Sequence, residues 1–372
     1  MSVVNLLKQL IAFPSVSSTT NDPVSSFAAS QLTRLGFETE RLTYTDPKGI
    51  LKVCVCGRRG PKGQGLAYFC HTDVVPADSW SFPHSGPWTA FESDNRIYGR
   101  GSCDMKGSLA CLLTAIERIE STSSPIFVVC TADEEVGYHG AAKVAAESTI
   151  YREIVSSQSC GLIGEPTRLQ VVHGHKGSRV GRVVSRGIAA HSSTPHGLNA
   201  NMAMIPFLHE LRALSLECDT APEWRDDRFD PPVISMNIGI NDHTPAINIT
   251  PPQSICTFYF RPMPGQNAED MVNRIRSMAD RHGLEFELLV SGDGLFTDPK
   301  SAFIRELAQL TSTESCTVPY GTDGSLFGEI KDLAVLGPGD IRQAHTDDEW
   351  ISRDQLSEGV ALYEKLVRHW CV

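Results

Sequence analysis

The chain has 372 residues, a formal net charge of -11 and a pI of about 5.6. Because single hydrophobic cores stop growing at about 250–300 residues, this length predicts two domains. The acidic balance argues against a phosphate-binding surface, and so against a nucleic-acid partner. No stretch approaches the roughly 18 apolar residues of a membrane span, and the first residues lack a basic leader, so we expect a cytoplasmic protein with no membrane partner.

The cysteines number eleven and follow no regular spacing. No CxxC pair occurs, so reduced core residues are favoured over a disulfide framework or a zinc ribbon. Cys54 and Cys56 alternate with apolar neighbours. This alternation indicates a strand, with metal binding as the weaker alternative.

Helical and strand-like segments alternate over the first 175 residues. The predicted elements are helices over 4–11, 23–36 and 108–119, and strands over 50–56, 66–70 and 125–131. Such alternation is typical of a mostly parallel sheet flanked by helices.

The pattern changes after residue 176 and returns at about residue 292. The intervening elements are helices over 199–214 and 268–282, and strands over 180–185, 233–240, 254–260 and 284–290. The last elements are a helix over 301–311, a strand over 333–336 and a helix over 353–370. We therefore predict an α/β fold whose catalytic domain, 1–176 and 292–372, is interrupted by a smaller two-layer α+β domain, 177–291.

Acidic and histidine side chains follow the apolar runs of the first and last parts of the chain. They are His71 and Asp73, Asp104 in a glycine-rich turn, Glu134 and Glu135, Glu165, and His345 in a glycine-rich loop. Ligands of open α/β sheets bind at the carboxyl ends of the strands, so these side chains can converge there. Two imidazoles and three carboxylates, one of them bridging, would give each of two zinc ions three protein ligands and leave room for a shared water.

Each segment alone also has an ordinary structural explanation. Asp73 and Asp104 could cap helices, the acids at 133–135 could form a solvated loop, and His345 could be a plain loop residue. Five such segments in one chain favour a common cause, which is a hydrolytic metal site. In that site Glu134 would be the general base, and Asp73 would hold His71 in its ligating tautomer.

In this order, the segments resemble the di-zinc aminoacyl-amidohydrolase and carboxypeptidase family. The family includes acetylornithine deacetylase, succinyl-diaminopimelate desuccinylase, aminoacylases and glutamate carboxypeptidase. The ligand set that the resemblance implies is His71, Asp104 and Glu165 for one zinc, and Asp104, Glu135 and His345 for the other. It also implies that Co²⁺ can substitute, that the Asp104-Met105 peptide is cis, and that the inserted domain is a lid through which the chain forms a homodimer.

Four further positions resemble substrate-side residues of the family. His191, in 187–195, resembles a histidine that reaches the partner's active site and stabilises the oxyanion. Arg261 resembles the arginine that grips the substrate carboxylate, and Asn248 resembles another substrate contact. Asp323 resembles part of a side-chain pocket where it could meet an ammonium group, although a turn-capping role is an equal alternative.

Segments 336–339 and 343–349 look closer to the acetylornithine deacetylase branch than to the desuccinylases. The resemblance therefore implies zinc-dependent hydrolysis of the amide of an N-acyl-L-amino acid, foremost N-acetylornithine, in arginine biosynthesis. Desuccinylase, acetylcitrulline or acetyl-lysine deacetylase and dipeptidase are the alternatives within the family. From other classes, a non-catalytic metal-binding or scaffold protein is disfavoured by the intact Glu134, and a redox sensor by the lack of a resolving cysteine pair.

Overall fold

The computed structural model describes all residues, 1–372, and contains two compact units. Unit 1 consists of Met1–Gly174, Leu295–Cys316 and Thr322–Val372. Unit 2 consists of His175–Gly294 and Thr317–Gly321. The first unit is therefore discontinuous, and the short segment 317–321 joins the second unit without any signal in the sequence.

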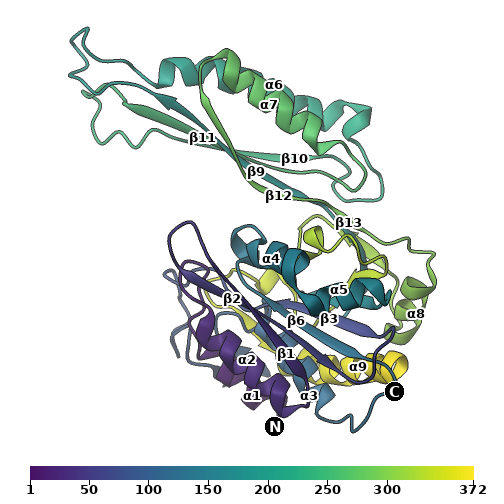
Figure 1. Cartoon of the computed structure of the whole chain (residues 1–372). Helices are drawn as coiled ribbons and strands as arrows, with labels where there is room; N and C mark the ends of the chain where they lie inside the picture. The colour runs from purple at the N-terminus through teal and green to yellow at the C-terminus, as the bar shows by residue number, and fades with distance from the viewer. The chain divides into compact units, whose positions relative to one another are not determined.

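The largest sheet has nine strands and carries the first unit (Figure 1). Its order is β1-β2-β6-β3-β7-β15-β8-β13, with β14 beside β8. The bounds are β1 Glu38–Thr45, β2 Leu51–Arg59, β3 Leu66–His71, β6 Ile126–Thr131, β7 Cys160–Ile163, β8 Val172–His175, β13 Leu295–Phe296, β14 Cys316–Val318 and β15 Leu333–Val335. The neighbours β6, β3, β7 and β15 run parallel, whereas β1 and β2 pair antiparallel at one side. The predicted α/β fold class is confirmed.

Helices cover both faces of this sheet. One hydrophobic core joins the strands to α1 (Val3–Ile11), α2 (Asp22–Arg34), α3 (Lys106–Ile116), α8 (Ala302–Thr311) and α9 (Arg353–Cys371). The helices α4 (His139–Glu147) and α5 (Thr149–Ser156) lie on the other face in Figure 1. Alternation along β2 sends Val53 and Val55 into the large core, while the Cys54 Sγ lies 3.6 Å from the Gly140 carbonyl oxygen in α4. The Cys54-Val55-Cys56 segment is thus part of a strand, and all eleven cysteines of the chain are free.

A small three-stranded sheet also belongs to unit 1. It consists of β4 (Phe91–Ser93), β5 (Arg96–Tyr98) and β16 (Trp350–Ser352) in the order β16-β5-β4. Through β5 and β16 it ties the residues that follow His345 to those that precede Asp104. Two segments that are far apart in the sequence are therefore held side by side.

Unit 2 is a four-stranded antiparallel sheet covered by two helices (Figure 1). The sheet order is β10-β11-β9-β12. The bounds are β9 Ser178–Arg186, α6 Asn201–Thr220, β10 Ser235–Asn241, β11 Gln253–Arg261, α7 Ala268–Arg281 and β12 Glu285–Gly292. None of the chain's helices combines the length and the apolar character that crossing a bilayer requires.

Candidate active site

The predicted ligands converge at the carboxyl ends of four neighbouring parallel strands. His71 is the last residue of β3, and Glu165 comes two residues after β7. The short helix η1 (Glu134–Val136) follows β6, and His345 follows β15 after the short helix η4 (Ile341–Gln343). Parallel neighbours end at the same edge of a sheet, so the strand order β6-β3-β7-β15 itself brings these side chains together.

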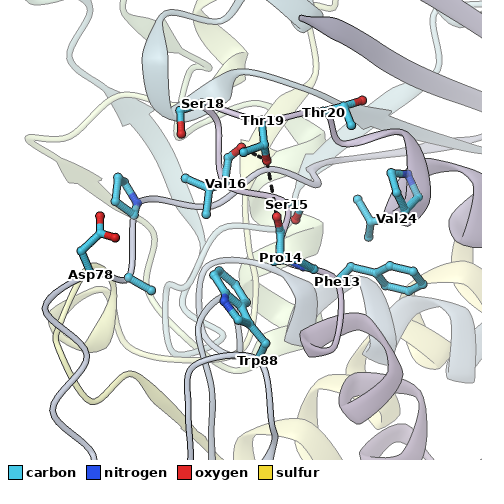
Figure 2. Close-up of a pocket in the computed structure, with 13 residues that line it drawn as sticks. Phe13, Pro14, Ser15, Val16, Ser18, Thr19, Thr20, Val24, Asp78 and Trp88 are labelled. Carbon is cyan, nitrogen blue, oxygen red and sulfur yellow. Dashed lines mark hydrogen bonds between the residues drawn. The ribbon is translucent and has the colours of Figure 1, made fainter.

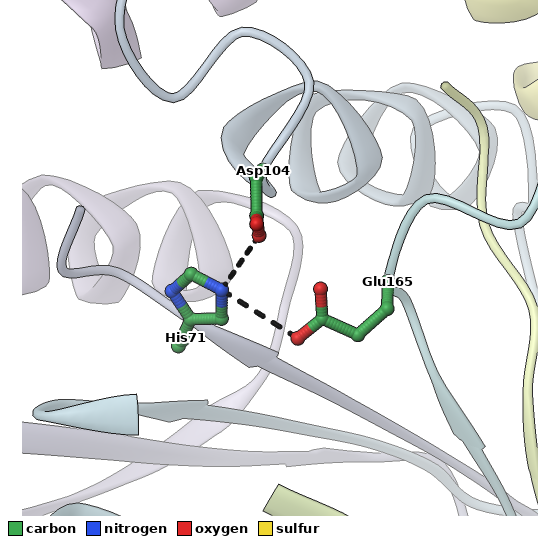
Figure 3. Close-up of side chains that lie close together, drawn as sticks. All are labelled: His71, Asp104 and Glu165. Carbon is green, nitrogen blue, oxygen red and sulfur yellow. Dashed lines mark hydrogen bonds and ion pairs between the residues drawn. The ribbon is translucent and has the colours of Figure 1, made fainter. Parts of the chain in front are cut away.

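The first ligand group is buried and consists of His71, Asp104 and Glu165 (Figure 3). The Nε2 atom of His71 lies 3.0 Å from Asp104 Oδ1 and 3.5 Å from Glu165 Oε1. Asp104 approaches from the turn that precedes α3, and its peptide bond to Met105 is cis. The three side chains point at one another from three separate elements, as Figure 3 shows.

The second ligand group shares Asp104 with the first. The Nε2 atom of His345 lies 3.4 Å from Asp104 Oδ2 and 3.0 Å from Glu135 Oε2. The His345 backbone has a φ of 63°, in the left-handed region, and 53% of its side chain is exposed. Asp104 therefore turns one carboxylate oxygen toward each group, which is the arrangement of a bridging ligand.

Both ligand groups bring carboxylates so close together that nearby positive charge would stabilise their ionised forms. Burial raises the pKa of Glu165 well above its ordinary value, and the Asp104 charge raises it further. Burial opposes a charge on His71, yet Glu165 and Asp104 raise its pKa well above the ordinary value. Hydrogen bonds with Asp104 and Glu135 raise the pKa of His345 to about 10. Two imidazoles and three carboxylates in this spacing are a donor set that fits a pair of zinc ions, whose charge would replace that of the imidazolium protons.

Asp73 contacts His71 through its backbone carbonyl, whereas we expected a contact through its carboxylate. The Nδ1 atom of His71 is 2.9 Å from the backbone carbonyl oxygen of Asp73 but 3.7 Å from its carboxylate. The carboxylate instead accepts hydrogen bonds from Ser17 Oγ at 2.7 Å and from the Glu134 backbone N–H at 3.2 Å. The backbone carbonyl of Asp73 binds Nδ1 of His71, so that Nε2 faces the other ligands. The carboxylate of Asp73 holds the first residue of η1 through its backbone amide.

Glu134 lies beside the two ligand groups and belongs to neither of them. Burial raises its pKa well above the ordinary value, and Glu165 and Glu135 add to this rise against the opposing effect of His71. A carboxylate with a raised pKa is a better proton acceptor, which suits a general base.

Asp133 anchors the turn that carries Glu134, a feature that the sequence did not reveal. Asp133 has a φ of 58° and accepts hydrogen bonds from Lys52 Nζ at 2.6 Å and from Tyr44 Oη at 2.8 Å. Lys52 is fully buried, and it also donates to the Ser17 carbonyl oxygen at 2.6 Å. A lysine inside the apolar run of β2 was the one available signal for this pair.

Three predicted site residues belong to unit 2. His191 and Asn248 are on exposed loops that pair with each other, because the Ser192 N–H donates to the Asn248 carbonyl oxygen at 2.9 Å. Arg261 is the last residue of β11, with its guanidinium carbon 4.4 Å from the centre of the Tyr259 ring. The Nη1 atom of Arg261 is buried and has no hydrogen-bond partner. Such a nitrogen is suited to receive an anionic group.

Asp323 lies in the interior of unit 1, where only 2% of it is exposed. Its Oδ2 accepts a hydrogen bond from Thr131 Oγ1, and its Oδ1 is buried without a partner. Burial raises its pKa to about 7. The position gives no support to the predicted contact with a substrate ammonium group, and Thr322, rather than Asp323, caps the short helix η3 (Asp323–Leu326).

A separate surface pocket of about 580 Å³ lies in unit 1 (Figure 2). Its walls include the apolar side chains of Phe13, Val24 and Trp88, with the Ser18 and Thr19 hydroxyls nearby. None of the predicted ligands lines it. The pocket is therefore distinct from the ligand groups.

Comparisons with known proteins found similar proteins over nearly the whole chain. Residues 67–369 match the profile of peptidase family M20/M25/M40. The chain is 32% identical to acetylornithine deacetylase of Myxococcus xanthus, and the alignment covers 98% of this chain and 96% of that protein. It is 31% identical to the protein of the same name from Pectobacterium carotovorum, with 99% of this chain and 97% of that protein covered. The M20 metallo-carboxypeptidase Sso-CP2 of Sulfolobus solfataricus has a similar fold, with a TM-score of 0.79, 18% identity and 99% of both chains covered. A further fold neighbour is described as a dinuclear metal-binding M20 peptidase of Bacillus subtilis, with a TM-score of 0.64, 14% identity, and 98% and 96% covered.

Proposed function

We propose that this chain, which belongs to peptidase family M20/M25/M40, is a zinc-dependent deacylase that hydrolyses N-acyl-L-amino acids, foremost N-acetyl-L-ornithine. Membership makes it a metal-dependent hydrolase. The finer assignment is supported by full-length relatives that are named acetylornithine deacetylase. The observation that carries the metal chemistry is Asp104, which turns one oxygen toward each of two ligand groups.

In this proposal the two ligand groups hold the zinc ions, and Glu134 handles the proton. When bound, the two ions would acidify a water and polarise the acyl carbonyl. Glu134 accepts the proton of the attacking water and returns it to the leaving nitrogen, so the amide yields a carboxylate and a free amine. The raised pKa of Glu134 supports this role.

Residues of unit 2 supply the substrate contacts in this proposal. Arg261 binds the α-carboxylate through a charge-assisted fork, which the unpartnered Nη1 atom supports. Asn248 provides a further polar contact. His191 of a second subunit stabilises the oxyanion of the tetrahedral intermediate.

A homodimer through unit 2 is part of the same proposal. The strand β10 is at the edge of its sheet, so its outer backbone groups are free to pair with another strand. Beside it, Met202 and Ile205 of α6 and Ile240 of β10 are 68%, 59% and 63% exposed. An exposed edge next to apolar side chains is the type of surface that a second copy of a chain covers.

A substrate panel tests the proposed activity. The purified protein should release amine from N-acetyl-L-ornithine with zinc or cobalt present, and a chelator should stop the reaction. N-acetyl-L-ornithine should have a higher kcat/KM than N-succinyl-diaminopimelate, N-acetylcitrulline, N-acetyl-lysine or a dipeptide. A reversed preference would assign the chain to another branch of the family, and turnover of none of them would refute the deacylase assignment.

A further inference from the structure

Glu349 binds the turn that contains Asp104, the residue shared by the two ligand groups. It is 1% exposed and immediately precedes β16. Its Oε2 accepts hydrogen bonds from Arg100 Nη1 at 2.9 Å and from the Gly101 N–H at 2.8 Å. Its Oε1 accepts hydrogen bonds from the backbone N–H groups of Cys103 at 2.8 Å and Asp104 at 3.0 Å. One carboxylate therefore binds one guanidinium and three backbone amides of a five-residue turn.

The turn depends on the Glu349 carboxylate because the amides of Gly101, Cys103 and Asp104 donate to it inside the protein. Gly101 has a φ of 80°, and residues 100–105 are all buried, so water does not replace a lost acceptor there. Arg100 balances the charge of Glu349 and donates a second hydrogen bond to the Pro76 carbonyl oxygen at 3.2 Å. The backbone takes part as well, since the Gly99 N–H donates to the Glu349 carbonyl oxygen at 3.0 Å.

Glu349 is thereby connected to both ligand groups without belonging to either. It holds the amide of Asp104, the residue that the two groups share. It also lies four residues after His345, a ligand of the second group. The two carboxylate oxygens of Glu349 are occupied by the turn, which leaves it the role of support rather than of ligand.

We propose that Glu349 is a positioning residue of the two-metal centre, which presets the Asp104 turn so that one carboxylate oxygen faces each ligand group. This inference rests on the proposed function, because it assumes that the two ligand groups bind metal ions. It predicts that loss of Glu349 weakens both metal-binding steps together, since the bridging ligand serves both. Loss of a ligand that belongs to one group would weaken chiefly one step.

Zinc binding to metal-free Glu349→Gln tests the proposal. The glutamine has the same shape but turns an amide group toward the N–H donors, so each dissociation constant should rise by roughly 10–100-fold, the usual effect of losing such support. The visible spectrum of the Co²⁺-loaded variant should also differ from wild type, which a mere loss of stability would not cause. The matched control is Glu153→Gln, which removes the 2.9 Å ion pair with Arg58 in the same unit and should leave both constants unchanged.

A folded Glu349→Gln protein that binds both ions with wild-type affinity would overturn the inference. If the wild-type chain binds no pair of metal ions, the proposed function fails instead, whatever the variant does. If the variant does not fold, hydrogen exchange on the metal-free wild-type protein still tests whether the Asp104 turn is ordered before zinc binds. The amides of Gly101, Cys103 and Asp104 should already exchange slowly before zinc is added, and rapid exchange that slows only with zinc would contradict a preset turn.

Discussion

In the proposed mechanism Glu134 is the general base, and its burial raises its pKa. We expect Glu134→Gln to keep its zinc and to lose about 10²–10⁴-fold in kcat, because the amide cannot accept the proton of the attacking water. Steady-state kinetics and elemental analysis of the same preparation measure both quantities. Turnover close to wild type with zinc retained would remove Glu134 from the mechanism.

Arg261 should discriminate between substrates by their α-carboxylate. Arg261→Ala should lower kcat/KM for N-acetyl-L-ornithine by roughly 10–100-fold, in line with the loss of a hydrogen-bonded charge pair of about 1.5–3 kcal/mol. The α-amide of the same substrate should be affected far less, since it cannot use the fork. Arg261→Lys keeps the charge but not the fork, so its kcat/KM for N-acetyl-L-ornithine should lie between those of the wild type and Arg261→Ala. Equal losses on acid and amide would mean that Arg261 has a structural role.

The candidate ligands could be named from the sequence because metal chemistry depends on residue type. His71, Glu135 and Glu165 follow apolar runs, and the parallel strand order explains why they meet, whereas Asp104 reaches them from the glycine-rich turn before α3. The supporting contacts could not be predicted in the same way. Glu349 and the side chain of Asp73 bind backbone amides, and a sequence does not show which amides a fold leaves without partners.

Close packing between two loops should make the position of Glu165 sensitive to a single methyl group. A Cβ atom at Gly337, just after β15, would lie 2.3 Å from the Gly164 carbonyl oxygen and 2.6 Å from that of Glu165. Gly337→Ala should therefore lower the free energy of unfolding by about 1–3 kcal/mol, the usual cost of overpacking, and weaken zinc binding.

The matched control is Gly328→Ala, where an added Cβ atom meets nothing within 4 Å. It should change the free energy of unfolding by no more than about 0.5 kcal/mol. Urea unfolding and zinc titration of both variants provide the comparison. Equal behaviour of the two variants would show that the loops adjust freely and do not fix Glu165.

The elements found from the sequence are those with a clear hydrophobic pattern, which is either a short continuous apolar run or a helical period. The buried strands β3 and β6 and the amphipathic helices α1, α7 and α9 were predicted within a few residues of their bounds. The three-residue strands β4, β5 and β16 are too short to show any period. The strand β1 is polar on its exposed face and mixed on the other, so pairing with β2, rather than its own sequence, makes it a strand.

For the molecule as a whole, a discontinuous catalytic domain could be predicted because His345 lies beyond the inserted block. The attachment of 317–321 to unit 2 could not, since it depends on tertiary contacts such as the hydrogen bond from Thr317 Oγ1 to the Arg228 carbonyl oxygen, at 2.6 Å. Tertiary contacts of this kind have no local periodicity, which is the signal that sequence reasoning uses.

The proposed dimer predicts that two inactive variants restore each other. Glu134→Ala and His191→Ala homodimers should each be nearly inactive. Free exchange of subunits makes half of the dimers mixed, and each mixed dimer has one site with both Glu134 and His191 intact. Activity should then recover to roughly a quarter of wild type. Proven exchange without recovery would show that His191 acts within its own subunit or has no part in catalysis.

The activity of the metal-free protein on N-acetyl-L-ornithine, followed while zinc is added back, tests the central claim most directly. The claim is that His71, Asp104, Glu135, Glu165 and His345 hold two metal ions that are needed for hydrolysis. Amine release should be negligible without metal and should level off when two zinc ions are bound per chain. Full activity without metal, or no zinc binding by a folded chain, would contradict the account.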